Sequence, residues 1–177
     1  MPVVSVFCKK GGVGKTTFLG YLAHYHSSKG EKVLVLSADD QNSIFKIFGA
    51  EKFVGERDDN YFEHLLAGEA QPNDIVFEAR PNMYIIKTLN TDRLSLTLTL
   101  RGPQETKLRQ LIDYIRRFFD YIFIDFPPSS SRWTEILLDL SNEILLVVGL
   151  DTLGLDGFIN TIRYFTDSDI DLGKIKY

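Results

Sequence analysis

The stretch GGVGKTT, from Gly11 to Thr17, has the residue types and spacing of a loop that folds around phosphate groups. Glycines at positions 11, 12 and 14 let the backbone bend so that successive N–H groups point inward at phosphate oxygens. The positive end of a following helix adds to that attraction. A glycine-rich turn that merely links a strand to a helix is the alternative interpretation.

Three side chains of this loop have separate expected tasks. Lys15 is placed to reach the β- and γ-phosphates of a nucleotide, and Thr16 is placed to offer its hydroxyl to Mg²⁺. Thr17 is placed to touch the α-phosphate. We therefore expect Lys15 to act in phosphoryl transfer as well as in binding.

A bound Mg²⁺-nucleotide also needs a carboxylate at the end of a neighbouring strand. The segment YIFIDFPPSSS supplies one, because four residues with the character of a buried strand precede Asp125. At the carboxyl edge of a sheet Asp125 can hold a Mg²⁺-bound water, and the two prolines stiffen the loop that follows. An aspartate at a strand-to-loop boundary is common by itself, so this interpretation depends on the phosphate loop.

The segment VLSADDQNS ends another strand and offers two further acidic residues. We assign to Asp39 the orientation of the water that attacks the γ-phosphate, and we count it among the candidate metal ligands. A helix is expected to begin near Asn42 or Ser43, with Asp40 or Asn42 as its cap.

These residues need a scaffold that brings strand ends together. Short apolar, β-branched runs alternate with helical patterns, which is typical of a parallel sheet covered by helices. The near-continuous apolar character of the runs fits strands that are buried on both faces. The expected strands are Val3–Phe7, Lys32–Ser37, Met83–Thr88, Tyr121–Asp125 and Glu143–Val148.

Apolar residues at helical spacing predict helices between these strands. They are expected over Thr16–Lys29, after Pro103, over residues 155–162, and over Tyr61–Ala67 with Asp59 or Asn60 as cap and Gly68 as stop. One segment has the other period. In RLSLTLTLRG the leucines at positions 94, 96, 98 and 100 favour a half-buried strand, although a loop or helix covering the sheet edge stays open.

Composition sets broad limits on the protein. A length of 177 residues predicts one domain with a continuous core, and no apolar run approaches the roughly 20 residues that cross a bilayer. The single cysteine, Cys8, excludes an internal disulfide and favours a reducing cytoplasm. Because the net charge is −4, any contact with nucleic acid must come from a local patch.

Taken together, these motifs resemble the ParA/MinD family of ATPases over nearly the whole chain. KGGVGKTT is similar to the family's deviant Walker A motif, whose early lysine, here Lys10, is the distinguishing mark. DYIFIDFPPSSS resembles its Walker B segment. NEILLVVGLDTLGLDGF resembles the later strand and helix start of partitioning members, which favours the ParA branch over MinD.

The resemblance implies an α/β fold of the P-loop NTPase type, with a mostly parallel sheet and helices on both faces. It implies an ATPase that uses Mg²⁺ and joins two subunits around ATP, with Lys10 reaching the nucleotide of the other subunit as an arginine finger does. A solvated loop lysine is the alternative for Lys10. The resemblance further implies plasmid or chromosome partitioning, with non-specific DNA and a centromere-binding ParB-like protein as partners.

The candidate site residues follow from the loop, the acidic strand ends and the resemblance. The expected catalytic residues are Lys10, Lys15 and Asp39; the expected nucleotide-binding residues are Lys10, Gly11, Gly12, Val13, Gly14, Lys15, Thr16 and Thr17; the expected metal ligands are Thr16, Asp39 and Asp125. Basic residues that suit either a DNA face or a solvated helix surface are Arg93, Arg101, Lys107, Arg109, Arg116 and Arg117.

Three features depart from the family pattern. The segment VLVLSADDQNSIFKIFG is similar to the family's second-strand motif, which has two aspartates one residue apart and then Pro-Gln. Ser37 stands at the first of these aspartates, which weakens one water-mediated contact to Mg²⁺, and Asp40 replaces the proline. The family continues beyond the position of Tyr177, where KIKY has the pattern of a further strand, so the chain is a fragment or a short form. A MinD-like positioning ATPase and a nucleotide-binding regulator with little hydrolysis are the alternative functions.

Overall fold

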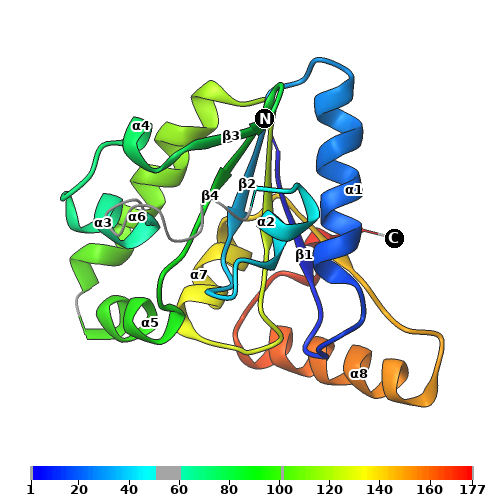
Figure 1. Ribbon diagram of the computed structural model, residues 1–177. Helices are drawn as coiled ribbons and strands as arrows, with labels where there is room; N and C mark the ends of the chain where they lie inside the picture. Colours follow the sequence, from blue (N-terminus) through cyan, green and yellow to red (C-terminus); the bar gives the residue numbers. More distant parts are fainter. Residues whose placement is uncertain (1, 51–60, 101, 177) are drawn as a thin grey trace.

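A computed structural model of the chain describes residues 2–50, 61–100 and 102–176. Within them, one sheet has the strand order β3-β4-β2-β5-β1-β6-β7 (Figure 1). All neighbouring strands run parallel except β3, which runs antiparallel to β4. The strands are β1 (Val3–Phe7), β2 (Val33–Ser37), β3 (Phe77–Arg80), β4 (Met83–Ile86), β5 (Tyr121–Asp125), β6 (Glu143–Leu146) and β7 (Ile175–Lys176).

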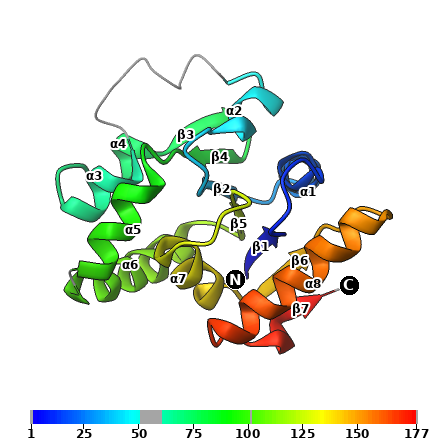
Figure 2. The ribbon, with the colours of Figure 1, turned by 90° about the horizontal axis from the view of Figure 1, so that it is seen from below.

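Helices cover both faces of this sheet, because successive strand residues are apolar and point to opposite sides. In β1, Val4 and Val6 pack with α1 (Lys15–Ser28) and α2 (Ser43–Ile47), whereas Val3 and Phe7 join the cluster on the other face (Figure 2). That second cluster includes residues of α3 (Phe62–Ala67), α4 (Pro72–Ile75), α5 (Thr91–Leu100), α6 (Gly102–Ile115), α7 (Arg132–Leu140) and α8 (Thr152–Asp167). Two short 3₁₀ turns, η2 (Arg116–Phe118) and η3 (Leu172–Lys174), complete the described elements.

The predicted fold class is confirmed, and so are the predicted strands. The structure begins β2 one residue later than expected, and it ends β4 and β6 two residues earlier. The sequence interpretation missed β3, whose side chains alternate between partly buried and exposed. This short edge strand contains a charged residue at every second position, so it lacks the apolar run by which the other strands were recognised.

The leucine-rich segment that favoured a strand forms the helix α5 instead. Leu94 and Leu98 are one helical turn apart and are each 2% exposed, whereas Leu96 is 59% exposed. The Oγ1 of Thr97 donates to the carbonyl oxygen of Arg93, four residues earlier, which satisfies the hydroxyl along the helix. The period-two pattern was therefore misleading, since Leu94 and Leu98 face the core and Leu96 does not.

The predicted short helix before β3 is present as α3, and Gly68 ends it with a φ of 82°. The N-cap position is occupied by Tyr61. The expected caps Asp59 and Asn60 lie outside the described residues. None of the helices in the described part of the chain combines the length and apolar character needed to cross a bilayer.

The strand order brings three functional segments to one edge of the sheet. β5 lies between β1 and β2, so the loops that follow these three strands are neighbours. Asp125 is in register with Val6 of β1 on one side and with Ser37 of β2 on the other. In an open parallel sheet, ligands bind at the carboxyl ends of the strands, next to the point where the strand order reverses.

Candidate functional site

The glycine-rich loop joins the end of β1 to the start of α1, as predicted. Gly12 and Gly14 have φ angles of 72° and 89°, a region that a residue with a Cβ rarely adopts. Gly14 occupies the N-cap of α1 and no side chain caps that helix end. The first N–H groups of α1 therefore remain available to phosphate oxygens, and the helix dipole favours negative charge there.

Lys15 is the buried cation of the loop. Its side chain lies among Cys8, Asp39 and Asp125, and burial lowers the pKa of its ammonium group while these neighbours partly oppose that shift. The Nζ atom donates to the carbonyl oxygen of Lys10 at 3.1 Å. This bond keeps the ammonium group of Lys15 within the glycine-rich loop.

Thr16 and Asp125 meet directly. The Oγ1 of Thr16 donates to Asp125 Oδ1 at 3.1 Å, which joins the start of α1 to the end of β5. Asp125 is 1% exposed, and its burial raises the pKa of the carboxyl group to about 7, although the Thr16 hydroxyl opposes the shift. The structure thus brings together the two predicted metal ligands that lie farthest apart in the sequence.

A hydroxyl and a carboxylate at a phosphate loop form an oxygen donor set that fits Mg²⁺. Magnesium keeps several waters and binds through one or two carboxylates together with substrate phosphates. Among the described residues, no three His, Cys, Asp or Glu side chains gather into a protein-only metal cluster. The buried Asp125 carboxylate, whose ionised form burial disfavours, is the group that a cation would stabilise.

The loop after β2 holds Asp39 close to this pair, although Asp39 makes no hydrogen bond to it among the described residues. Its Oδ1 accepts the backbone N–H of Gln41 at 3.0 Å, and its carbonyl oxygen accepts the hydroxyl of Ser37. Ser37 is fully buried. Ser37, which stands where the family motif has an aspartate, therefore stabilises the loop that contains Asp39.

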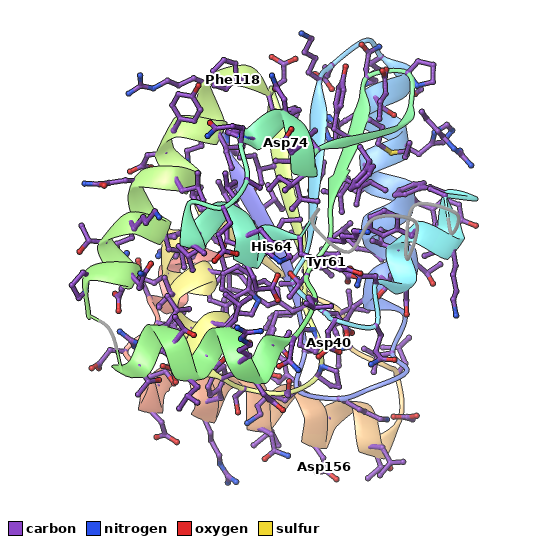
Figure 3. The ribbon with its side chains drawn as sticks, turned by 60° about the vertical axis from the view of Figure 1, so that its left-hand side comes forward. Asp40, Tyr61, His64, Asp74, Phe118 and Asp156 are labelled. Carbon is purple, nitrogen blue, oxygen red and sulfur yellow. The ribbon has the colours of Figure 1, made fainter. Side chains whose placement is uncertain are left out.

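The helix predicted to begin near Asn42 or Ser43 is confirmed as α2, but the side-chain capping bond predicted for Asp40 or Asn42 is not formed. Asn42 occupies the N-cap of α2, but its side chain donates to the carbonyl oxygen of Thr88 instead of capping the helix. Asp40 Oδ2 accepts from the Oγ1 of Thr91 at 3.1 Å, at the start of α5 (Figure 3). Both residues tie the loop after β2 to the chain that follows β4, which only the sheet order makes its neighbour.

Lys10 lies at the surface of the site. Its Nζ is 3.5 Å from Asp151 Oδ1, and the two side chains are 28% and 63% exposed. Asp151 also caps α8 by accepting from the backbone N–H of Gly154. Lys10 thus contacts Lys15 through its backbone carbonyl, whereas its own ammonium group pairs with Asp151. Because this ion pair is exposed, it stabilises the fold only weakly.

Sequence reasoning missed Asp151 as a contact of Lys10. The signal that was available is an aspartate three residues before a glycine at a helix start, which is typical of an N-cap. Nothing in the sequence paired it with a lysine 141 residues away. Val13 and Thr17 lie in the loop and the first turn of α1, in the positions expected from the motif.

Comparison with known proteins agrees with this geometry. A family model described as an AAA domain matches residues 1–172. The chain is 27% identical over 173 residues to the sporulation initiation inhibitor protein Soj of Bacillus subtilis, an alignment that covers 91% of this chain and 64% of that protein. The chain belongs to the ParA/MinD family of ATPases.

Solved structures show the same fold as this ParA/MinD chain. An ATP complex of McdA from Cyanothece has a TM-score of 0.83 at 23% identity and covers 99% of this chain and 68% of that one. Cobyrinic acid a,c-diamide synthase from Mycobacterium smegmatis, with bound ADP and magnesium, has a TM-score of 0.79 at 22% identity, with coverage of 99% and 71%. The chain spans between about half and two thirds of the length of the first curated relatives it matches, 52% to 64%.

Proposed function

We propose that residues 1–177 form one P-loop ATPase domain that binds Mg²⁺-ATP, hydrolyses it to ADP and phosphate, and acts as a dimerisation switch in DNA partitioning. The observation that carries this proposal is the 3.1 Å hydrogen bond between Thr16 and Asp125, with the buried Lys15 beside it. These groups lie at the carboxyl edge of the sheet, where such a nucleotide binds.

The residues of one subunit supply most of the binding site. The backbone N–H groups of residues 11–17 surround the phosphates, and Lys15 exchanges the Lys10 carbonyl for a phosphate oxygen. Thr16 and Asp125 would hold Mg²⁺, which neutralises charge on the phosphates when it is bound. Asp39, whose carboxylate accepts from the Gln41 N–H in the ligand-free structure, orients the attacking water.

Lys10 has a different task from that of Lys15. Its ammonium group is held at the start of α8, at the surface, by an exposed and therefore weak ion pair with Asp151. We assign to Lys10 a contact with the triphosphate of a second subunit. A cation delivered in this way stabilises charge on the transferring phosphoryl group.

Light scattering of the purified chain with Mg²⁺-ATP, with Mg²⁺-ADP and with neither tests the switch. The expected result is a dimer with ATP alone, and a monomer under all conditions for Lys10→Ala. Lys29→Ala is the matched control, because Lys29 is an exposed lysine beyond the far end of α1, where it contacts Tyr25. Dimerisation of Lys10→Ala with the affinity of the unmodified protein would refute the role of Lys10.

Hydrolysis is tested separately by steady-state phosphate release. Asp39→Ala is expected to lose at least tenfold in kcat, since a positioned water contributes on the order of a hundredfold or more. Turnover at the rate of the unmodified protein in this variant would exclude the role given to Asp39.

Two of the basic residues expected at a DNA face form ion pairs within the fold. Arg109 is paired with Glu105 and Asp139, and Arg116 with Asp113, so these two are used within the fold. Arg101 lies outside the described residues. Within the described part, Arg93, Lys107 and Arg117 make no ion pair, and they are the candidates for phosphate contacts.

DNA and a ParB-like protein are therefore proposed partners. A mobility shift with duplex DNA should require Mg²⁺-ATP and should disappear at moderate salt, because phosphate contacts release counterions. DNA binding that is independent of the nucleotide would argue against a partitioning switch. A MinD-like ATPase that positions another cargo would then remain the alternative function.

One observation favours a second function, that of a nucleotide-binding regulator with little hydrolysis. The hydroxyl of Ser37 is buried and donates to the Asp39 carbonyl oxygen, so this position supplies no carboxylate that could hold a metal-bound water. Tight binding of Mg²⁺-ATP without measurable phosphate release would select this function.

A further inference from the structure

Trp133 is the only tryptophan of the chain and lies in the first turn of α7, just beyond the loop that follows Asp125. Its side chain is fully buried, and its ring centroid is 5.1 Å from that of Phe62. Apolar packing explains why the ring is inside the protein. It does not explain the indole N–H, a donor that needs a partner when it is buried.

The partner of the indole N–H is the carbonyl oxygen of Ala38. The Nε1 atom of Trp133 donates to it at 3.3 Å, across 95 positions of the sequence. The N–H of Ala38 in turn donates to the carbonyl oxygen of Asp125 at 2.8 Å. The backbone N–H of Ala38 is thus held by Asp125, at the end of β5, and its carbonyl oxygen is held by α7.

The Ala38 carbonyl belongs to the peptide unit that also contains the backbone nitrogen of Asp39. Because a peptide unit is planar and rigid, fixing this carbonyl fixes the direction in which the chain enters Asp39. Ser37 holds the far side of the same residue through the Asp39 carbonyl oxygen. The Asp39 carbonyl oxygen also accepts from the Asn42 N–H, and the Asp39 side chain accepts from the Gln41 N–H. The Trp133 indole N–H is therefore the contact that holds the peptide on the N-terminal side of Asp39.

Trp133 also connects this loop to α5. Its backbone N–H, one of those left without a partner inside α7, donates to the Oγ of Ser95 at 3.4 Å. The start of α5 is held in turn by Asp40, which accepts from Thr91. The helix α5 is thus attached to the Asp39 loop directly, through Asp40 and Thr91, and indirectly, through Ser95 and Trp133.

We propose that Trp133 is a positioning residue for hydrolysis, whose indole N–H holds the Ala38–Asp39 peptide so that Asp39 can orient the attacking water. This inference rests on the proposed function, because it requires that the chain hydrolyses Mg²⁺-ATP. Trp133 touches neither the nucleotide nor the metal ligands in this role. Its loss should lower kcat and leave the affinity for ATP nearly unchanged.

The unique tryptophan allows a nearly isosteric test. Growth of a tryptophan auxotroph on β-(benzothienyl)alanine replaces the indole N–H by sulfur at position 133 and nowhere else in the chain. Growth on 7-azatryptophan is the matched control, since it changes the ring but keeps the N–H. Removing one neutral hydrogen bond that positions a catalytic group should reduce kcat by about tenfold in the first protein and by less than threefold in the second.

Two further measurements separate positioning from general damage. The Kd for Mg²⁺-ATP, measured by calorimetry, should stay within about twofold in both proteins. Hydrogen exchange of the ligand-free protein should be faster over residues 36–42 in the benzothienyl protein and unchanged in the control. Should the analogue prevent folding, Trp133→Phe offers the same loss of the N–H with an aromatic ring retained.

The outcomes are distinct. An unchanged kcat in the benzothienyl protein, or equal losses in kcat and ATP affinity, would overturn the role of Trp133 while the proposed hydrolysis stands. No turnover in the unmodified protein would overturn the proposed hydrolysis, and this role with it, whatever the exchange data show. A tenfold loss of kcat with faster exchange and unchanged Kd supports the proposal.

Discussion

At the scale of single residues, the site depends on a carboxylate placed where ionisation is unfavourable. Asp125 is buried at the end of β5, and burial raises the pKa of its carboxyl group to about 7. In the unfolded chain the same group titrates near its ordinary pKa of 3.8. The folded protein therefore retains this proton over a range in which the unfolded protein loses it.

The sign of the resulting pH dependence follows. Because the folded-state pKa is raised, the contribution of Asp125 to the free energy of unfolding is complete below about pH 4 and is lost as the pH rises to 7, by up to about 4 kcal/mol. Asp125→Asn should remove this part of the pH dependence and should be more stable than the unmodified protein at pH 8. Urea denaturation of both ligand-free proteins between pH 4 and 8 measures the difference, and parallel curves would contradict the prediction.

Asp151 offers a second prediction at this scale, because it has two interactions of different strength. It caps α8 through the Gly154 N–H, and it forms an exposed ion pair with Lys10. Asp151→Ala should lower the free energy of unfolding by about 1 kcal/mol, the value of an N-cap. Asp151→Asn keeps the acceptor and should lie within about 0.5 kcal/mol of the unmodified protein. Equal losses in the two variants, measured by urea denaturation, would mean that the ion pair dominates.

At the scale of elements, α5 shows how a sequence period can mislead. Its leucines alternate with Ser and Thr, yet the segment is helical, because the helix buries Leu94 and Leu98 against the rest of the core. The side of α5 that faces solvent also carries a leucine, Leu96. Alternation along the sequence is therefore compatible with a helix when both faces contain leucine.

This arrangement predicts a contrast between two leucines of the same helix. Leu98→Ala should lower the free energy of unfolding by about 2 to 4 kcal/mol, because it leaves a cavity in the core. Leu96→Ala should change it by less than about 0.5 kcal/mol, since an exposed side chain is lost and alanine favours a helix. Chemical denaturation of the two variants measures both values. A strand in this segment would bury both leucines or neither, and the two losses would be similar.

At the scale of the whole molecule, the site is built from segments that are far apart in the sequence. The loop of residues 11–17, Asp39 and Asp125 come from three strands and meet only in the folded sheet. A ligand that touches all three segments binds the folded state alone and so stabilises the whole molecule.

The last prediction concerns this coupling. Mg²⁺-ATP at 100 times its Kd should raise the free energy of unfolding by about 2.7 kcal/mol, which a thermal shift assay detects as a higher Tm. Asp125→Asn should lose the part of the shift that depends on magnesium. The Tm shift of the unmodified protein is measured with ATP in EDTA and with ATP and Mg²⁺, and the same pair of measurements is made on Asp125→Asn. An equal magnesium-dependent shift in the two proteins would show that Asp125 does not hold the metal.

The sequence by itself determined the parallel sheet, the phosphate loop and the acidic strand end, because each leaves a local signal. Buried strands appear as continuous apolar runs, and a phosphate loop needs its glycines, lysine and threonine in consecutive positions. For the same reason Lys15, Thr16 and Asp125 were recognised as candidates before the structure placed them together.

Only the tertiary structure decided what depends on contacts between distant segments. Asp40 or Asn42 was expected to cap the next helix, but the sheet order places Asp40 beside Thr91, whose hydroxyl donates to its carboxylate. Trp133 belongs to none of the sequence motifs, and its bond to Ala38 exists because β2 and β5 are neighbours. The physical reason is general. A hydrogen bond between residues 51 or 95 positions apart leaves no mark on the composition or period of either segment, so it can be read only after the strands are ordered.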